Sequence, residues 1–311
     1  MSRVFDALQR SGAEQSGVEY PDLMSMVTQV FEAPPQNPAL GETPAEPGPE
    51  QQREQPEPSV LAPSALPQPA PEAVVSALNS LPSLKVQVTG GSRLVFLTEP
   101  DSLAAEKFRF LGVRLRQLQQ SRKLKKILIT STIPEEGKSM VSANLAGALT
   151  RKKQKVLLIE GDLRRPVMAR QFGLGRLAGL GEWLQGEPRP LSNIYYLDGP
   201  NFWLMPAGDP PANPLELMQS GRLSLLMEQL SGLFDWIVVD SPPLLPLADT
   251  TVWSRLTDGT LLVAREGKTE KKQLQRGLEA LKKSDLLGVV LNGCEHTGDK
   301  NYYQRYAPNA K

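Results

Sequence analysis

The chain has 311 residues, and its 35 lysines and arginines almost balance its 34 aspartates and glutamates. This balance offers no bulk charge for binding nucleic acid, and a single cysteine, Cys294, excludes an internal disulfide framework and fits a reducing compartment. The sequence shows neither a secretory signal nor an apolar run long enough to cross a membrane, so we expect a cytoplasmic protein.

The first part of the chain is set apart by its composition. Residues 1–32 contain short apolar stretches that could dock on a partner or form a frayed helix. Thirteen of the 28 prolines then fall between Pro34 and Pro82, among Glu, Gln, Ala and Ser. Such a segment cannot bury enough apolar surface to offset the entropy lost on ordering. We predict a docking segment at 1–32, a disordered Pro-rich linker at 33–84, a globular domain at 85–298 and a tail at 299–311.

The globular part begins with a predicted helix at 103–120, where leucines recur at helical spacing. Strands are predicted at 126–131, 155–160, 194–197, 202–206, 235–240, 260–265 and 287–292. Further helices are predicted at 138–152, 214–231, 248–256 and 269–284. This alternation predicts an α/β fold, with a doubly wound, mostly parallel sheet and helices on both of its faces.

The segment after the first of these strands has the form of a phosphate-binding loop. It reads Ser131-Thr-Ile-Pro-Glu-Glu-Gly-Lys-Ser139 and leads from a strand into a helix. In such loops the backbone amides and the helix N-terminus bind phosphate, the lysine reaches the β- and γ-phosphates, and the serine binds Mg²⁺. The strict GxxxxGK(S/T) pattern fails at Thr132, so an ordinary turn stays open for this stretch alone. The predicted nucleotide contacts are Pro134, Glu135, Glu136, Gly137, Lys138, Ser139 and Met140.

Carboxylates follow two later strands. One strand runs Val156-Leu-Leu-Ile-Glu160-Gly-Asp162, and another ends at Asp240 before Ser-Pro-Pro. The carboxyl ends of parallel strands form the edge where open α/β sheets bind ligands. We therefore predict a magnesium site formed by Ser139, Glu160, Asp162 and Asp240. Each of these motifs, taken alone, could also be a buried strand that merely ends in a polar residue.

Together these motifs resemble the bacterial tyrosine kinases (BY-kinases), which serve capsule and exopolysaccharide synthesis and belong to the deviant Walker A, MinD/ParA-like P-loop ATPases. The shared features are the proline-containing Walker A loop, the Walker A′ sequence Asp162-Leu-Arg164-Arg-Pro, the Walker B strand ending at Asp240 before Pro-Pro, and a tyrosine-rich tail. The match runs from about Leu103 to the end of the chain. It implies an autokinase that uses ATP and Mg²⁺ to phosphorylate its own C-terminal tail, and so regulates polysaccharide synthesis or export.

The resemblance also assigns roles to residues. Lys138, Asp162 and Arg164 become the catalytic set, with Asp162 accepting the tyrosine proton. Arg164 either neutralises charge in the transition state or positions phosphate; a salt bridge at the sheet edge is the alternative. Asp249 matches an acidic position of the family, or else caps a helix. Asn292 either touches the nucleotide base or ends a strand in a turn.

The tail and the partners follow from the same resemblance. Tyr302, Tyr303 and Tyr306 are the expected phosphate acceptors, modified between neighbouring chains; a tail with incidental aromatic residues is the alternative. A membrane-embedded chain-length regulator is the expected activator and would hold the protein at the inner face of the membrane. A homo-oligomer is also implied.

Three positions depart from the family pattern. Glu160 replaces an aspartate, Met140 replaces a frequent serine or threonine, and Gly112 replaces the last arginine of the oligomerisation motif Glu106-x-x-Arg109-x-x-Arg. These departures keep a second hypothesis open, a catalytically weak ATP-binding co-polymerase scaffold. A ParA/MinD-type positioning ATPase is a third, although its signature lysine is replaced here by Ile133.

Overall fold

The computed structural model describes residues 78–88, 92–150, 154–186, 190–245, 248–281 and 286–294. All of them belong to the second of two units into which the chain divides, residues 65–311. The predicted docking segment, most of the predicted linker, and the tail with Tyr302, Tyr303 and Tyr306 lie outside the described residues.

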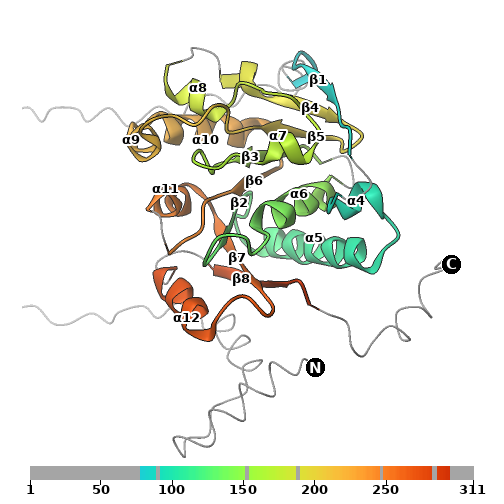
Figure 1. Cartoon of the computed structure of the whole chain (residues 1–311). Helices are drawn as coiled ribbons and strands as arrows, with labels where there is room; N and C mark the ends of the chain where they lie inside the picture. Colours follow the sequence, from blue (N-terminus) through green and yellow to red (C-terminus); the bar gives the residue numbers. More distant parts are fainter. Residues whose placement is uncertain are drawn as a thin grey trace, which may run out of the picture. The chain divides into compact units, whose positions relative to one another are not determined.

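An eight-stranded sheet forms the centre of this described part, in the order β1-β4-β5-β3-β6-β2-β7-β8 (Figure 1). Each neighbouring pair is parallel except β4 and β5, which are antiparallel. The strands are β1 Ser83–Lys85, β2 Lys126–Ser131, β3 Val156–Glu160, β4 Tyr195–Asp198, β5 Phe202–Met205, β6 Trp236–Asp240, β7 Gly259–Arg265 and β8 Leu286–Asn292. The prediction of a mostly parallel α/β fold is therefore confirmed.

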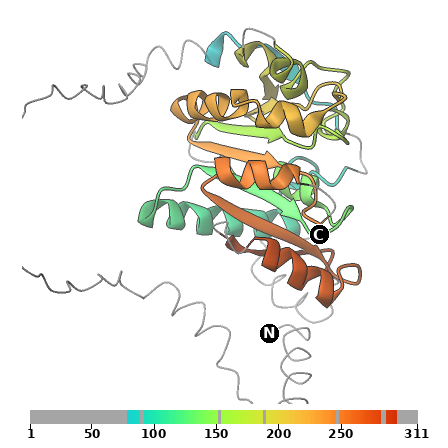
Figure 2. The same ribbon diagram turned by 90° about the vertical axis from the view of Figure 1, so that its left-hand side faces the viewer.

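Helices cover both faces of the sheet, as Figures 1 and 2 show. One apolar core lies between the sheet and α5 (Leu103–Ser121), α6 (Lys138–Leu149) and α7 (Met168–Gln171), with α4 (Val95–Thr98) packed beside them. The other lies between the sheet and α8 (Leu180–Leu184), α9 (Pro214–Gln219), α10 (Arg222–Leu233) and α11 (Asp249–Leu256). Strands β3 and β6 are buried along their whole length. That is why they read as unbroken apolar runs in the sequence.

Several elements differ from the predicted ones. The single helix predicted at 214–231 is two helices, because Gly221 adopts a left-handed conformation with φ of 78° between α9 and α10. Strand β1 starts at Ser83, inside the range predicted as linker, and pairs with β4. The short helices α4, α7 and α8 were not predicted, nor were the 3₁₀ helix Pro190–Asn193 and β1. Helix α12 spans Lys271–Ala280, within the range predicted at 269–284.

The helices among the described residues are too short or too polar to cross a membrane.

Candidate active site

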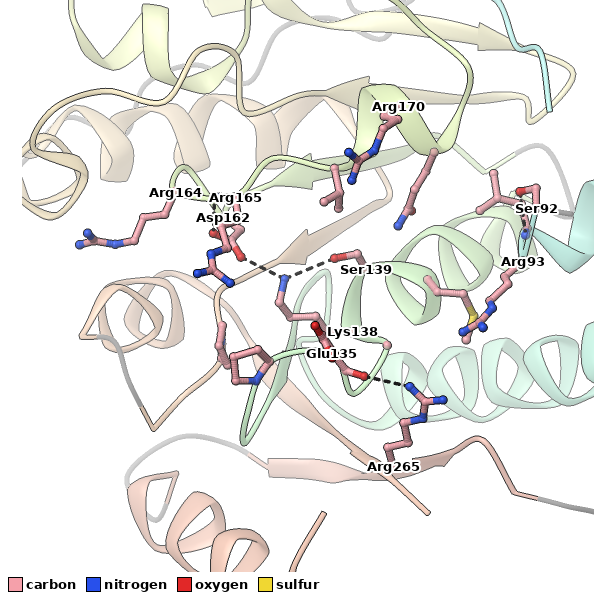
Figure 3. A pocket seen from close by; sticks show the side chains of 17 residues that line it. Ser92, Arg93, Glu135, Lys138, Ser139, Asp162, Arg164, Arg165, Arg170 and Arg265 are labelled. Atoms are coloured by element: carbon pink, nitrogen blue, oxygen red, sulfur yellow. Dashed lines mark hydrogen bonds and ion pairs between the residues drawn. The ribbon is translucent and has the colours of Figure 1, made fainter. Parts of the chain in front are cut away.

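A cavity of about 880 Å³ opens at the edge of the sheet where β2, β3 and β6 end. Because these strands are parallel and adjacent, the groups that follow them gather at one place (Figure 3). Two carboxylates, Glu135 and Asp162, line the cavity. Six cationic side chains line it as well: Arg93, Lys138, Arg164, Arg165, Arg170 and Arg265. The excess of positive charge suits a polyanionic ligand.

The centre of the cavity is a cluster around Lys138. Its Nζ lies 3.1 Å from Asp162 Oδ2 and 3.7 Å from Asp240 Oδ2. Ser139 Oγ donates to Asp240 Oδ2 at 2.6 Å, and Ser142 Oγ lies 3.2 Å from Asp240 Oδ1. The structure thus brings together Lys138, Ser139, Asp162 and Asp240, as the sequence led us to expect. A lysine, a serine and two carboxylates at one helix start are the groups that hold a metal-bound nucleotide.

Burial changes the titration of this cluster. Burial raises the pKa of Asp240, an effect that Lys138 and the hydroxyl of Ser139 oppose. Burial alone would lower the pKa of Lys138, but the charges of Asp240 and Asp162 outweigh it, so this pKa lies above its usual value. Lys138 therefore stays charged at neutral pH and can pair with phosphate.

Hydrogen bonds hold the phosphate loop in shape, and some of them come from side chains far away in the sequence. Glu136 is fully buried and accepts hydrogen bonds from Thr132 Oγ1 at 2.8 Å, from Ile133 N at 2.9 Å and from Thr269 Oγ1. Asn292 Nδ2 donates to the carbonyl of Glu136 at 2.8 Å. Glu136 and Asn292, both predicted to touch the nucleotide, are thus occupied in shaping the loop. The long separations in sequence hide this role from sequence reasoning.

The loop's outer side carries two further contacts. The exposed carboxylate of Glu135 lies 2.6 Å from Lys268 Nζ, and its carbonyl accepts from Arg265 Nη1 at 3.3 Å. Pro134 and Met140 line the cavity, where they were predicted. Gly137 has φ of 95°, a left-handed conformation that favours glycine at the start of α6.

Glu160 does not join the cluster, in contrast to the prediction that it ligates a metal. It is 1% exposed. One carboxylate oxygen accepts from Met168 N at 2.7 Å and from Val167 N, and the other accepts from Ala207 N at 3.0 Å. Burial raises the pKa of Glu160, although these three amides act against that rise. The side chain ties the start of α7 to the segment after β5.

The assignment of Ser139, Glu160, Asp162 and Asp240 as metal ligands stays a prediction, and of these four side chains Glu160 is the one bound to backbone amides. Across the described ranges, no group of three or more His, Cys, Asp or Glu side chains could hold a metal ion by itself. Ser139, Asp162 and Asp240 are the oxygen-bearing side chains that lie beside Lys138 near the phosphate loop. This fits magnesium, which keeps several waters and uses one or two carboxylates together with the phosphates of a substrate.

Helix α11 binds the loop that follows β3 and the loop that follows β6, a role that the sequence did not reveal. Asp249, which is 1% exposed, accepts from Arg164 Nε at 2.8 Å and from Arg164 Nη2 at 3.2 Å. Trp253 Nε1 donates to the carbonyl of Gly161 at 3.2 Å, and Thr250 Oγ1 to that of Pro242 at 2.8 Å. Of the two interpretations of Arg164, the structure has the salt bridge. Asp249 forms that pair and does not cap the helix.

Gly112 lies in the helix contact between α5 and α6. A Cβ at this position would lie 3.5 Å from the carbonyl of Ala148. Glu106 and Arg109, the other two positions of the oligomerisation motif, form an ion pair at 2.6 Å. The arginine at the third position of the family motif is therefore replaced by a glycine that is buried against α6.

Comparison with known proteins agrees with this site. The chain is 35% identical over 209 residues to the tyrosine-protein kinase YwqD of Bacillus subtilis, a match that covers 65% of this chain and 88% of YwqD. It is 34% identical to the tyrosine-protein kinase ptk of Acinetobacter johnsonii, covering 62% of this chain but only 26% of ptk. The solved kinase domain of Escherichia coli ETK aligns with a TM-score of 0.64 and 29% identity, over 68% of this chain and 84% of that one.

No protein-family model matches the sequence. The match to YwqD nevertheless spans most of that protein. The chain belongs to the family of bacterial tyrosine-protein kinases.

Proposed function

We propose that this protein is a protein-tyrosine kinase that uses Mg·ATP to phosphorylate Tyr302, Tyr303 and Tyr306 in the tail of another copy, and that it serves capsule or exopolysaccharide synthesis. The observation that carries the proposal is the convergence of Lys138, Ser139, Asp162 and Asp240 in one cation-lined cavity. Its family membership supports the same activity.

The cavity fits a nucleoside triphosphate. Its volume of about 880 Å³ lies within the usual range for small-molecule sites. Gly137 and the N-terminus of α6 supply backbone amides, and Lys138 supplies a charge that persists at neutral pH. The hard oxygen ligands that Ser139 and Asp240 provide suit Mg²⁺. ATP bound here supplies the phosphoryl group.

In this proposal Asp162 takes the proton of the acceptor phenol. Its Oδ2 faces Lys138, and its Oδ1 accepts from the backbone N–H of Arg165 at 3.1 Å, so the carboxylate is fixed at both oxygens. A tyrosine hydroxyl starts near pKa 10. Help from a general base is worth about 10²- to 10⁴-fold, and charge stabilisation by Lys138 and the metal supplies more.

A second candidate function is an ATP-binding scaffold that transfers no phosphate. It is favoured by one observation, the hydrogen bonding of Glu160 to three backbone amides in place of a contact near the phosphate loop. A catalytic metal would then have one carboxylate fewer than the family pattern provides.

We also propose that a membrane-embedded chain-length regulator activates the protein and holds it at the inner face of the membrane. Family membership supports this partner. The cytoplasmic segment of that regulator belongs in any activity assay, because a missing activator would imitate an inactive enzyme.

The test is phosphorylation of the full-length chain in a mixture of two variants. One variant keeps the three tail tyrosines but carries Lys138→Met; the other keeps Lys138 but has the three tyrosines replaced by phenylalanine. With Mg·ATP and the regulator segment, mass spectrometry is expected to find phosphotyrosine on the Lys138→Met chains only when both are present. Nucleotide binding by the unmodified protein without phosphotyrosine would favour the scaffold.

A further inference from the structure

Two adjacent arginines follow Asp162, and the structure directs their side chains to different places. Arg164 is bound through Nε and one terminal nitrogen by the buried carboxylate of Asp249. In Figure 3 it extends away from Lys138, while Arg165 lies beside Asp162 on the side of Lys138. Arg164, to which the resemblance assigned a catalytic role, lines the cavity but has its guanidinium paired with Asp249.

Arg165 keeps its charged group available. No hydrogen bond or ion pair reaches its guanidinium from the residues that the structure describes, and the side chain lines the cavity. Its charge also acts across the opening toward the phosphate loop. The pKa of Glu135 is lowered mainly by Lys268, and in smaller measure by Arg265 and Arg165.

The backbone explains why Arg165 has this direction. Its N–H donates to Asp162 Oδ1 at 3.1 Å, and the preceding side chain is fixed by Asp249 on α11. The carbonyl of Gly161, at the start of the same turn, is held by Trp253 at 3.2 Å. With the turn fixed at these three points, consecutive side chains must diverge. Asp249 holds the side chain of Arg164, and the bond from its own N–H to Asp162 holds the backbone of Arg165.

We propose that Arg165, rather than Arg164, contacts the γ-phosphoryl group of the nucleotide. This rests on the proposed function and assigns one more residue to that site. The loop amides and Lys138 approach the phosphates from the side of α6, whereas Arg165 approaches from the side of Asp162, where the acceptor tyrosine must enter. The group between those two sides is the one transferred. A guanidinium presents a planar fork of donors that matches phosphate oxygens.

The test measures the affinity of the full-length chain for Mg·ADP and Mg·ATPγS by titration calorimetry. Arg165→Ala is expected to lower the affinity for Mg·ATPγS about tenfold or more and to change the affinity for Mg·ADP by less than about twofold. Arg165→Lys keeps the charge without the planar fork of donors, so its affinity for Mg·ATPγS is expected to lie between those of the original protein and Arg165→Ala. Arg276→Ala removes an exposed arginine of α12 outside the cavity and is expected to change neither affinity.

Arg164→Ala is the contrasting variant. It leaves the buried Asp249 without its partner, so we expect a lower melting temperature and an equal loss for both nucleotides. The double variant Arg164→Ala/Asp249→Asn is expected to recover melting temperature. The proposal would be overturned if Arg165→Ala weakened the binding of both nucleotides equally or had no effect on either. A selective loss of Mg·ATPγS affinity in Arg164→Ala would overturn it as well.

These affinities do not depend on tail phosphorylation. A protein that forms no phosphotyrosine but loses ATPγS selectively in Arg165→Ala would refute the kinase proposal and support the assignment of Arg165. A protein that forms phosphotyrosine but shows no selective loss of ATPγS affinity in Arg165→Ala would support the kinase proposal and refute the assignment of Arg165.

Discussion

Asn292 Nδ2 donates to the carbonyl of Glu136 at 2.8 Å, so the end of β8 holds the phosphate loop one residue before Gly137. The two elements approach so closely that a Cβ on Gly137 would lie 2.1 Å from that nitrogen. Gly137 is also left-handed, with φ of 95°. Shape and hydrogen bonding at this point therefore require a glycine and an asparagine together.

The first prediction concerns this contact. Asn292→Asp keeps the shape of the side chain but places an oxygen against the carbonyl of Glu136, where a donor stood. We expect nucleotide affinity to fall about tenfold, since a lost donor leaves the carbonyl unpaired and adds repulsion. Fluorescence titration with a labelled nucleotide measures it. An Asn292→Asp protein that binds as tightly as the original would contradict the scaffolding role.

The second prediction concerns the metal. Asp240→Asn removes the charge that faces Ser139 and Lys138 while keeping the size of the side chain. We expect phosphotyrosine formation to fall at least about 100-fold, because a bound metal supplies several kcal/mol of charge stabilisation. Removal of Mg²⁺ with a chelator should weaken ATP binding in the original protein and change it little in the variant. Asp198→Asn, at the end of β4, is the matched control; an equal response to chelation in both variants would exclude Asp240 as a ligand.

The third prediction concerns pH. The pKa of the buried Glu160 lies above its ordinary value of 4.5, so between that value and the folded-state pKa the folded protein binds more protons than the unfolded chain. Its contribution to stability is thus lost as the pH rises, by at most about 1.4 kcal/mol per pH unit for one proton. Asp240 acts in the same direction, so the replacement of Glu160 alone removes part of this slope.

Glu160→Gln is therefore expected to flatten the fall in the free energy of unfolding as the pH rises above 4.5. Urea unfolding at several pH values measures the slope. The comparison uses slopes rather than absolute values, because the glutamine also changes the hydrogen bonds to Val167, Met168 and Ala207. Identical slopes for the two proteins would show that Glu160 does not titrate in this range.

The fourth prediction concerns the packing of α4 on α6. A Cβ on Gly147 would lie 2.5 Å from the ring of Phe96, which itself packs against Phe202. Gly147→Ala is expected to lower the free energy of unfolding by about 1–3 kcal/mol through overpacking. Replacement of Phe96 by alanine in the same chain should recover part of that loss, so that the two changes are not additive. If the two changes in the free energy of unfolding were strictly additive in chemical unfolding, the cost of Gly147→Ala would not come from a clash with the ring of Phe96.

Much of this fold could be predicted from the sequence for a physical reason. The strands β2, β3 and β6 are buried on both faces, so each reads as an apolar run bounded by charge. Their order in a parallel sheet then places Lys138, Asp162 and Asp240 at one edge. The short β1 and α4 carry too few residues for any periodicity, and they depend on contacts with β4 and α6.

The roles of individual polar groups could not be predicted in the same way. The orientation of Glu160 depends on amides at Val167, Met168 and Ala207, as far as 47 residues away. Arg164 and Arg165 are identical neighbours, and only Asp249, 85 residues from Arg164, distinguishes them. Sequence spacing identifies which residues meet at a sheet edge, but the hydrogen-bond partner of each group is set by the tertiary fold.

The contact between Asn292 and Glu136 has a consequence for how the tail can be studied. Asn292, which supports the nucleotide loop, stands ten positions before Tyr302 in the sequence. Deletions meant to remove the acceptor residues must leave β8 and Asn292 whole; a cut a few positions earlier would disable the catalyst and be mistaken for loss of its substrate.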